Sequence, residues 1–126
     1  MLSCAALTFL SSLALTDVSA LSSEVETGAR ALNAQTEITP RLFADLADFS
    51  GDAERLSIAL NEAGVEQELP CIFQDIATDA RLRMSEFRDA DTEAERAAAF
   101  TNLRVLTDDA IQLAPIAASM AADSQK

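Results

Sequence analysis

Cys71 has the side chain best suited to covalent chemistry in this sequence. It follows Pro70 near the start of a predicted helix, where the helix dipole and unpaired N–H groups favour a thiolate. However, there is no second Cys at Cys-x-x-Cys spacing, no His in the chain, and no Lys or Arg within five residues on either side. Ile72 and Phe73 come next, and a free Cys among apolar residues usually behaves as a small buried hydrophobe. We therefore favour a buried structural cysteine and keep a reactive thiol as the alternative.

Carboxylates are abundant, but their spacing matches no metal motif. The run 89–93 begins like a calcium loop, yet Ala94 and Phe100 stand where that loop needs Gly and Glu. Asp48, Asp52 and Glu54 surround Ser50-Gly51, and helix capping by Asp52 with solvation of the others explains them without a cation. The absence of His excludes His-ligated zinc, His-ligated haem and an imidazole general base. We expect no catalytic residue, no metal and no cofactor.

Composition indicates one acidic globular domain. The chain has 126 residues, of which 49% are apolar, and 21 acidic residues against 9 basic ones give a net charge of −12. This apolar content is too high for a disordered acidic tail, and the charge argues against nucleic acid as a partner. It favours a partner protein with a basic surface. Arg outnumbers Lys and Ala is common, as is typical of bacterial proteins encoded by GC-rich genomes.

Residues 1–20 resemble a signal peptide. Residues 1–16 carry no charged side chain, and Val18 and Ala20 form a cleavage site of the A-x-A type. Cleavage after Ala20 would remove Cys4, leave 106 of the 126 residues, and deliver the protein to the periplasm or the medium. The apolar stretch is too short for stable membrane insertion. The alternative is a cytoplasmic protein that keeps this segment as a helix, because no basic residue precedes Arg30.

Helical periodicity runs through the rest of the chain and predicts inward apolar stripes, which include Phe49, Ile72, Ile76, Phe87, Leu103, Leu106 and Leu113. The patterns predict helices over 21–35, 40–63, 70–89 and 92–115, with the second helix broken at Ser50-Gly51 and the last stopped or kinked at Pro115. Start and stop signals support them: a Ser23–Glu26 capping box with a Glu26–Arg30 pair in the first helix, Thr39-Pro40, Gly64 after the second helix, and a Thr92–Glu95 capping box. Short links predict an all-α, antiparallel up-down four-helix bundle over 21–115 with an apolar segment before it, and a small-residue tail over 116–126.

We interpret the protein as a non-catalytic module that binds another protein. The expected contact surface adjoins the helix breaks and comprises Phe49, Ser50, Gly51, Asp52 and Pro70. On this interpretation, Phe49→Asp should weaken partner binding and leave the helices intact. One alternative is a thiol redox protein or disulfide-linked dimer using Cys71. Another is a carrier that holds a hydrophobic ligand between Phe43, Phe73, Phe87 and Phe100. The sequence does not determine the oligomeric state.

Overall fold

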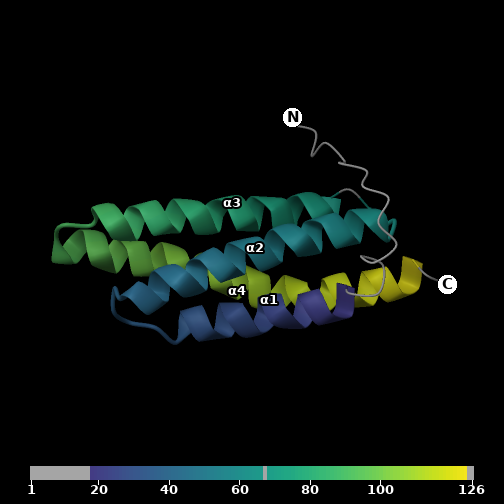
Figure 1. Cartoon of the computed structure of the whole chain (residues 1–126), viewed down its shortest axis with the longest axis horizontal. Coiled ribbons are helices and arrows are strands. Elements are labelled where there is room, and N and C mark those ends of the chain that lie inside the picture. Colours follow the sequence, from purple (N-terminus) through teal and green to yellow (C-terminus); the bar gives the residue numbers. More distant parts are fainter. Residues whose placement is uncertain (1–17, 67, 125–126) are drawn as a thin grey trace.

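A computed structural model describes residues 18–66 and 68–124. Within these ranges there are four helices and no strand: α1 (Val18–Asn33), α2 (Pro40–Glu62), α3 (Glu68–Asp89) and α4 (Glu93–Ser124). Successive helices run antiparallel, and α4 lies beside α1 and closes the bundle (Figure 1). This confirms the predicted all-α four-helix bundle. None of the described helices is long and apolar enough to cross a membrane.

Two buried serines set the register of α2 against α3. Ser50 Oγ donates to the carbonyl oxygen of Ala77 at 2.8 Å, and Ser57 Oγ donates to that of Pro70 at 2.6 Å. The two serines are seven residues apart on α2, and their acceptors Ala77 and Pro70 are seven residues apart on α3 in the opposite chain direction, as two turns of antiparallel helices require. Burying a hydroxyl group costs little free energy when a carbonyl oxygen of the neighbouring helix accepts its hydrogen bond.

The second helix is therefore not broken, and this detail of the prediction was wrong. Ser50 and Gly51 lie inside a continuous α2. Ser50 is a poor helix former in isolation, but here its hydroxyl bonds to α3 and does not compete for the α2 backbone. Asp52 is not a helix cap; it forms an ion pair with Arg55 on the outer face of the same helix.

The predicted caps of α2 are both present. Thr39 Oγ1 accepts a hydrogen bond from Leu42 N at 3.2 Å, and Pro40 is the first helical residue. At the other end, Gly64 has a φ of 80°, and its N–H bonds to the Asn61 carbonyl at 3.2 Å. The next N–H, of Val65, bonds to the Leu60 carbonyl at 3.1 Å, which completes a Schellman motif.

Asn33 sets the register of α1 against α4. Arg104 Nη1 donates to the Asn33 carbonyl at 3.0 Å, and Thr107 Oγ1 donates to Asn33 Oδ1 at 3.2 Å. Beyond this point α4 follows α1 with small buried residues, namely Ala110, Ala114, Ala117 and Ala121. Because alanine side chains are small, α4 can lie close to α1 wherever the two helices are in contact.

The ends of α1 and α4 differ from the prediction. The first helix begins at Val18, so Ser23 and Glu26 lie inside it and do not form a capping box, although Glu26 pairs with Arg30 at 3.0 Å as expected. The last helix continues through Pro115 to Ser124, because Ala117 and Ala121 pack in the core. Most of the predicted signal peptide, residues 1–17, lies outside the described residues.

The predicted capping box of α4 is present and makes stability depend on pH. Glu95 Oε1 accepts from Thr92 N at 3.0 Å and from Asp91 N at 3.2 Å, and Thr92 Oγ1 accepts from Glu95 N at 3.0 Å. The pKa of Glu95 is held below its ordinary value of 4.5, mainly by the Thr92 side chain and to a smaller extent by the backbone N–H groups of Asp91 and Thr92. Ionised Glu95 therefore stabilises the folded state.

We expect this stabilisation to be complete above the ordinary pKa and to disappear as pH falls through the lowered folded value. The measurement is the melting temperature of the wild type minus that of Glu95→Gln, taken from about pH 7 down to about pH 3. Because the other carboxylates are common to both proteins, the difference isolates Glu95. It should be positive at neutral pH and shrink on acidification; a difference that does not change with pH would contradict the assignment.

Candidate binding groove

The structure does not support the predicted contact surface. Phe49 and Ser50 are 1% and 3% exposed, and Pro70 is also buried, while Gly51 and Asp52 are half-buried. Phe49 falls on the inner stripe of α2 because it follows the helical period of the buried residues Leu42, Leu46 and Ala53. With no helix break, Phe49 has no reason to turn outward.

Cys71 is half-buried and is the fourth residue of α3. It is therefore less enclosed than a structural core cysteine was expected to be. Its N-terminal position in a helix agrees with the prediction, but neither Lys nor Arg lies near it in sequence to stabilise a thiolate further. The other cysteine, Cys4, lies outside the described residues, so the thiol alternative stays a prediction.

The four phenylalanines proposed to hold a ligand do not surround one space. The Ser50–Ala77 and Ser57–Pro70 bonds place Phe43 of α2 near the C-terminal end of α3. Phe73 lies near the opposite end of α3, about 15 Å away along the bundle axis. Phe87 and Phe100 pack on each other edge to face, with ring centroids 4.8 Å apart. Their contact is an internal packing contact between α3 and α4, so these rings do not form a shared pocket.

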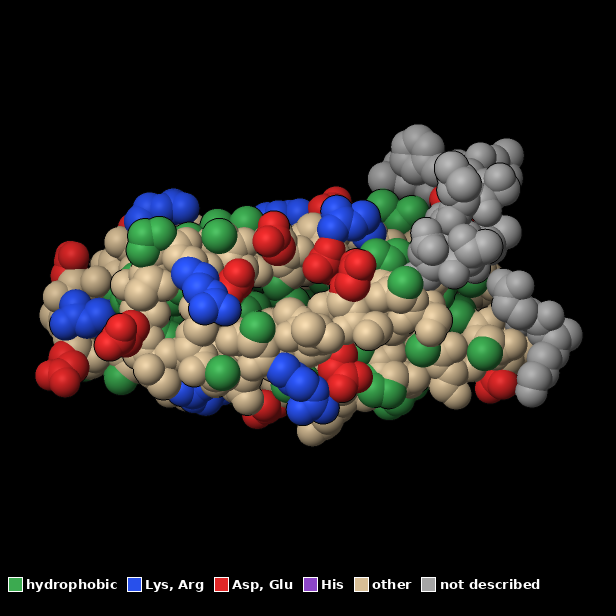
Figure 2. Space-filling model, turned by 60° about the horizontal axis from the view of Figure 1, so that its bottom comes forward, with side chains coloured by type: hydrophobic (Ala, Val, Ile, Leu, Met, Phe, Trp, Pro, Cys, Tyr) green, Lys and Arg blue, Asp and Glu red, His purple; other side chains and the backbone are tan. Residues whose placement is uncertain are grey.

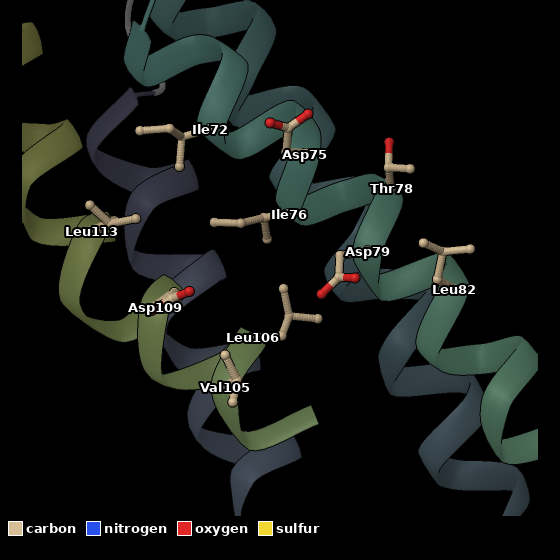
Figure 3. A pocket seen from close by; sticks show the side chains of 10 residues that line it. All are labelled: Ile72, Asp75, Ile76, Thr78, Asp79, Leu82, Val105, Leu106, Asp109 and Leu113. Carbon is tan, nitrogen blue, oxygen red and sulfur yellow. The ribbon is translucent and has the colours of Figure 1, made fainter. Parts of the chain in front are cut away.

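A groove lies between α3 and α4. These two helices share the least extensive contact among neighbouring pairs of the bundle, because α4 passes from α3 towards α1 along its length. The groove has a volume of about 390 Å³. Its apolar lining comprises Ile72, Ile76, Leu82, Val105, Leu106 and Leu113. Figure 3 shows Ile72 opposite Leu113, and Ile76 opposite Leu106, with α1 and α2 beyond them.

The two sides of the groove end in exposed apolar side chains. Leu82 on α3 is 54% exposed and Val105 on α4 is 59% exposed. Ile76, in contrast, is 6% exposed and Leu106 is 4% exposed, so these two buried side chains form the floor of the groove. An apolar floor that continues into exposed apolar sides suits a binding groove better than isolated surface residues do.

All charged groups that line the groove are carboxylates. They are Asp75, Asp79 and Asp109. Asp79 pairs with Arg83 at 3.3 Å, and Arg83 also pairs with Glu86 at 3.0 Å. Asp75 and Asp109 form no ion pair with any residue of the described ranges. The face drawn in Figure 2, in contrast, has basic and acidic side chains interspersed.

Sequence reasoning did not identify this groove. Ile72, Ile76, Leu106 and Leu113 were assigned to apolar stripes and therefore to the core. The available signal was the position of Leu82 and Val105, two large apolar residues that do not belong to the inward stripes of their helices. The sequence pattern does not show that α3 and α4 contact each other less than the other neighbouring helices do. This limited contact leaves part of the apolar stripe on each of the two helices without a partner.

The described residues assemble no cluster of three or more Cys, Asp or Glu side chains suited to a metal ion. Comparisons with protein-family models, with curated proteins and with solved structures each found no match to this chain. The function is therefore inferred from the groove alone.

Proposed function

We propose that this protein is a non-catalytic interaction module that binds another protein at the α3–α4 groove. The observation that supports it is a groove in which both the buried floor, Ile76 and Leu106, and the exposed sides, Leu82 and Val105, are apolar. Burial of such a surface against a partner gives a favourable free energy of about 25 cal/mol per Å². The groove is open to solvent, which suits a protein surface better than a small substrate.

We also propose that the module acts outside the cytoplasm of a bacterium, after removal of residues 1–20. Support comes from the uncharged run 1–16 and the small residues Val18 and Ala20. Cleavage there would remove the first three residues of α1, including the buried Val18. Val18 is 5% exposed at the free end of the bundle, so we expect its loss to leave the remaining core in place.

Site-specific photo-crosslinking in the cells that naturally make the protein tests the binding proposal. A photoreactive phenylalanine analogue at Val105 should give a discrete crosslinked product that the same analogue at Ala47 does not give. Ala47 is an exposed residue of α2, outside the lining of the groove, and is therefore a matched control. A second substitution, Leu82→Ser, should reduce the Val105 product because it removes apolar contact from the facing side.

Identical products from both positions, or no product from either, would overturn the proposal. A product that contains only a second copy of this chain would replace it with self-association through the same groove. The intact mass of the protein recovered from its native cell fraction tests export separately: loss of the mass of residues 1–20 supports it, and the full-length mass contradicts it.

A further inference from the structure

The dimensions of the groove restrict what can enter it. Its α3 side runs from Ile72 to Leu82, ten residues or about 15 Å of helix. A whole α-helix is about 10–12 Å wide with its side chains, which is too wide for a hollow of about 390 Å³. Side chains projecting from one face of a helix, by contrast, are of suitable size. The natural occupant is therefore a helix that lies along the groove and inserts one face.

The lining offers two apolar levels along that length. Ile72 faces Leu113 at one end, and Ile76 and Leu82 of α3 lie towards Leu106 and Val105 of α4 at the other (Figure 3). Leu113 and Leu106 are seven residues apart, about 10 Å along α4, which matches apolar anchors two helical turns apart, at positions i and i+7 of a bound helix. An extended strand would place alternate side chains about 7 Å apart and leave the opposite row without contacts.

The charges restrict the occupant further. Asp75 on α3 and Asp109 on α4 lie on opposite sides of the groove, and neither is neutralised by a described basic side chain. Asp79 is already paired with Arg83. Lys or Arg on both flanks of the inserted face would find one unpaired carboxylate on each side. A second copy of this acidic chain would bring like charges together, which opposes association.

We infer that the α3–α4 groove binds an amphipathic helix of a partner protein, with an apolar face of about two turns inserted and basic residues on both flanks. This inference rests on the proposed function and specifies the chemistry of its partner. The apolar levels supply most of the affinity, and Asp75 and Asp109 supply selectivity for positive charge and faster association at low salt.

The test uses a synthetic peptide and the intrinsic fluorescence of Trp. The protein has no Trp and no Tyr, so a single Trp at the centre of the apolar face of a peptide reports on binding alone. Three helical peptides share this face and differ only in their flanks, which carry Lys, Gln or Glu. The full-length protein is titrated against each at low and at physiological salt, and the shift of Trp emission gives Kd.

We expect the Lys peptide to bind at least about 10-fold more tightly than the Glu peptide, with the difference shrinking as salt rises. Leu82→Ser combined with Val105→Ser should weaken the Lys peptide about 10-fold, as loss of well-packed apolar contacts does. Asp75→Asn combined with Asp109→Asn should weaken the Lys peptide about 3- to 10-fold and leave the Gln peptide unchanged. All four positions are exposed or partly exposed, so the variants should keep the wild-type melting curve.

Asp48→Asn is the matched control for charge, because Asp48 is an exposed carboxylate of α2 outside this groove. It should not change the affinity for any peptide. Equal binding of all three peptides would overturn the selectivity for basic helices but leave the proposed function standing. Absence of binding by any peptide, while Val105 still crosslinks to a partner in cells, would overturn the helical partner alone. Binding that is unaffected by the Leu82 and Val105 substitutions would place the peptide elsewhere and overturn the inference.

Discussion

Phe49→Asp is expected to unfold this protein. Phe49 is 1% exposed, and its Cδ1 lies 3.4 Å from the position that a Cβ on Gly28 of the neighbouring helix would occupy. Loss of a fully buried phenylalanine side chain costs about 3–5 kcal/mol, and an unpaired buried carboxylate adds several more. The free energy of unfolding of a domain this size is about 5–15 kcal/mol in total. The substitution therefore removes most or all of the stability.

The measurements are far-ultraviolet circular dichroism and thermal unfolding at neutral pH. Phe49→Asp should lose most of its helical signal and its cooperative transition. Ala47→Asp puts the same charge on the exposed side of α2 and should change the free energy of unfolding by less than about 0.5 kcal/mol. Phe49→Leu keeps the site apolar and should cost about 1–2 kcal/mol.

This expectation reverses the one drawn from the sequence, in which Phe49→Asp weakens partner binding and spares the helices. A folded Phe49→Asp protein with wild-type dichroism would contradict the core position of Phe49. If that folded protein also lost its partner, the contact surface would have to be moved back to α2.

Pro115→Ala is expected to have a large effect in the opposite direction. Pro115 lies inside α4, which continues for nine residues beyond it, and proline cannot donate the backbone hydrogen bond to the carbonyl of Ile111. A proline inside a helix costs about 3 kcal/mol relative to alanine. Greater freedom of the unfolded chain after substitution returns about 0.4–1 kcal/mol. We therefore expect a net gain of about 2 kcal/mol and a melting temperature higher by roughly 5–10 °C.

Pro115 is exposed, so its replacement takes no side chain from the core. Gln112→Ala is the control, because Gln112 is an exposed residue one turn earlier and its replacement should change stability only slightly. Denaturant unfolding monitored by circular dichroism gives both free energies. An unchanged or lower stability of Pro115→Ala would show that the packing of Ala117 and Ala121 against α1 depends on a bend at the proline.

Local signals predicted the ends of helices where side chains bond to the nearby backbone. Thr39-Pro40 and the Thr92–Glu95 box do so within one turn, and Gly64 is the described glycine with a positive φ. These features do not depend on the rest of the fold, so the sequence identified them correctly. Where a residue bonds to another helix, the same reasoning failed: Ser50 resembled a helix break and instead donates to Ala77.

The burial of individual side chains was likewise predicted where it depends on the helical period alone, and was not predicted where it depends on contacts between helices. The helical period assigned Ile76, Phe87 and Leu103 to buried faces, and all three are buried. The same period placed Phe49 on an apolar face, but the break predicted in α2 led to its assignment as a contact residue. Pro115 was expected to end or kink the last helix, but α4 continues past it because the alanines that follow pack against α1.

The sequence by itself determined the helical class, the number of helices, most of their caps and the acidic surface, because these depend on side-chain period, nearby hydrogen bonds and total charge. Only the tertiary structure decided that α2 is continuous and that Phe49 is internal. It also decided that α3 and α4 leave a groove between Ile76 and Leu106. Those three features depend on the register and the divergence of helices far apart in the chain, which interactions between neighbouring residues do not specify.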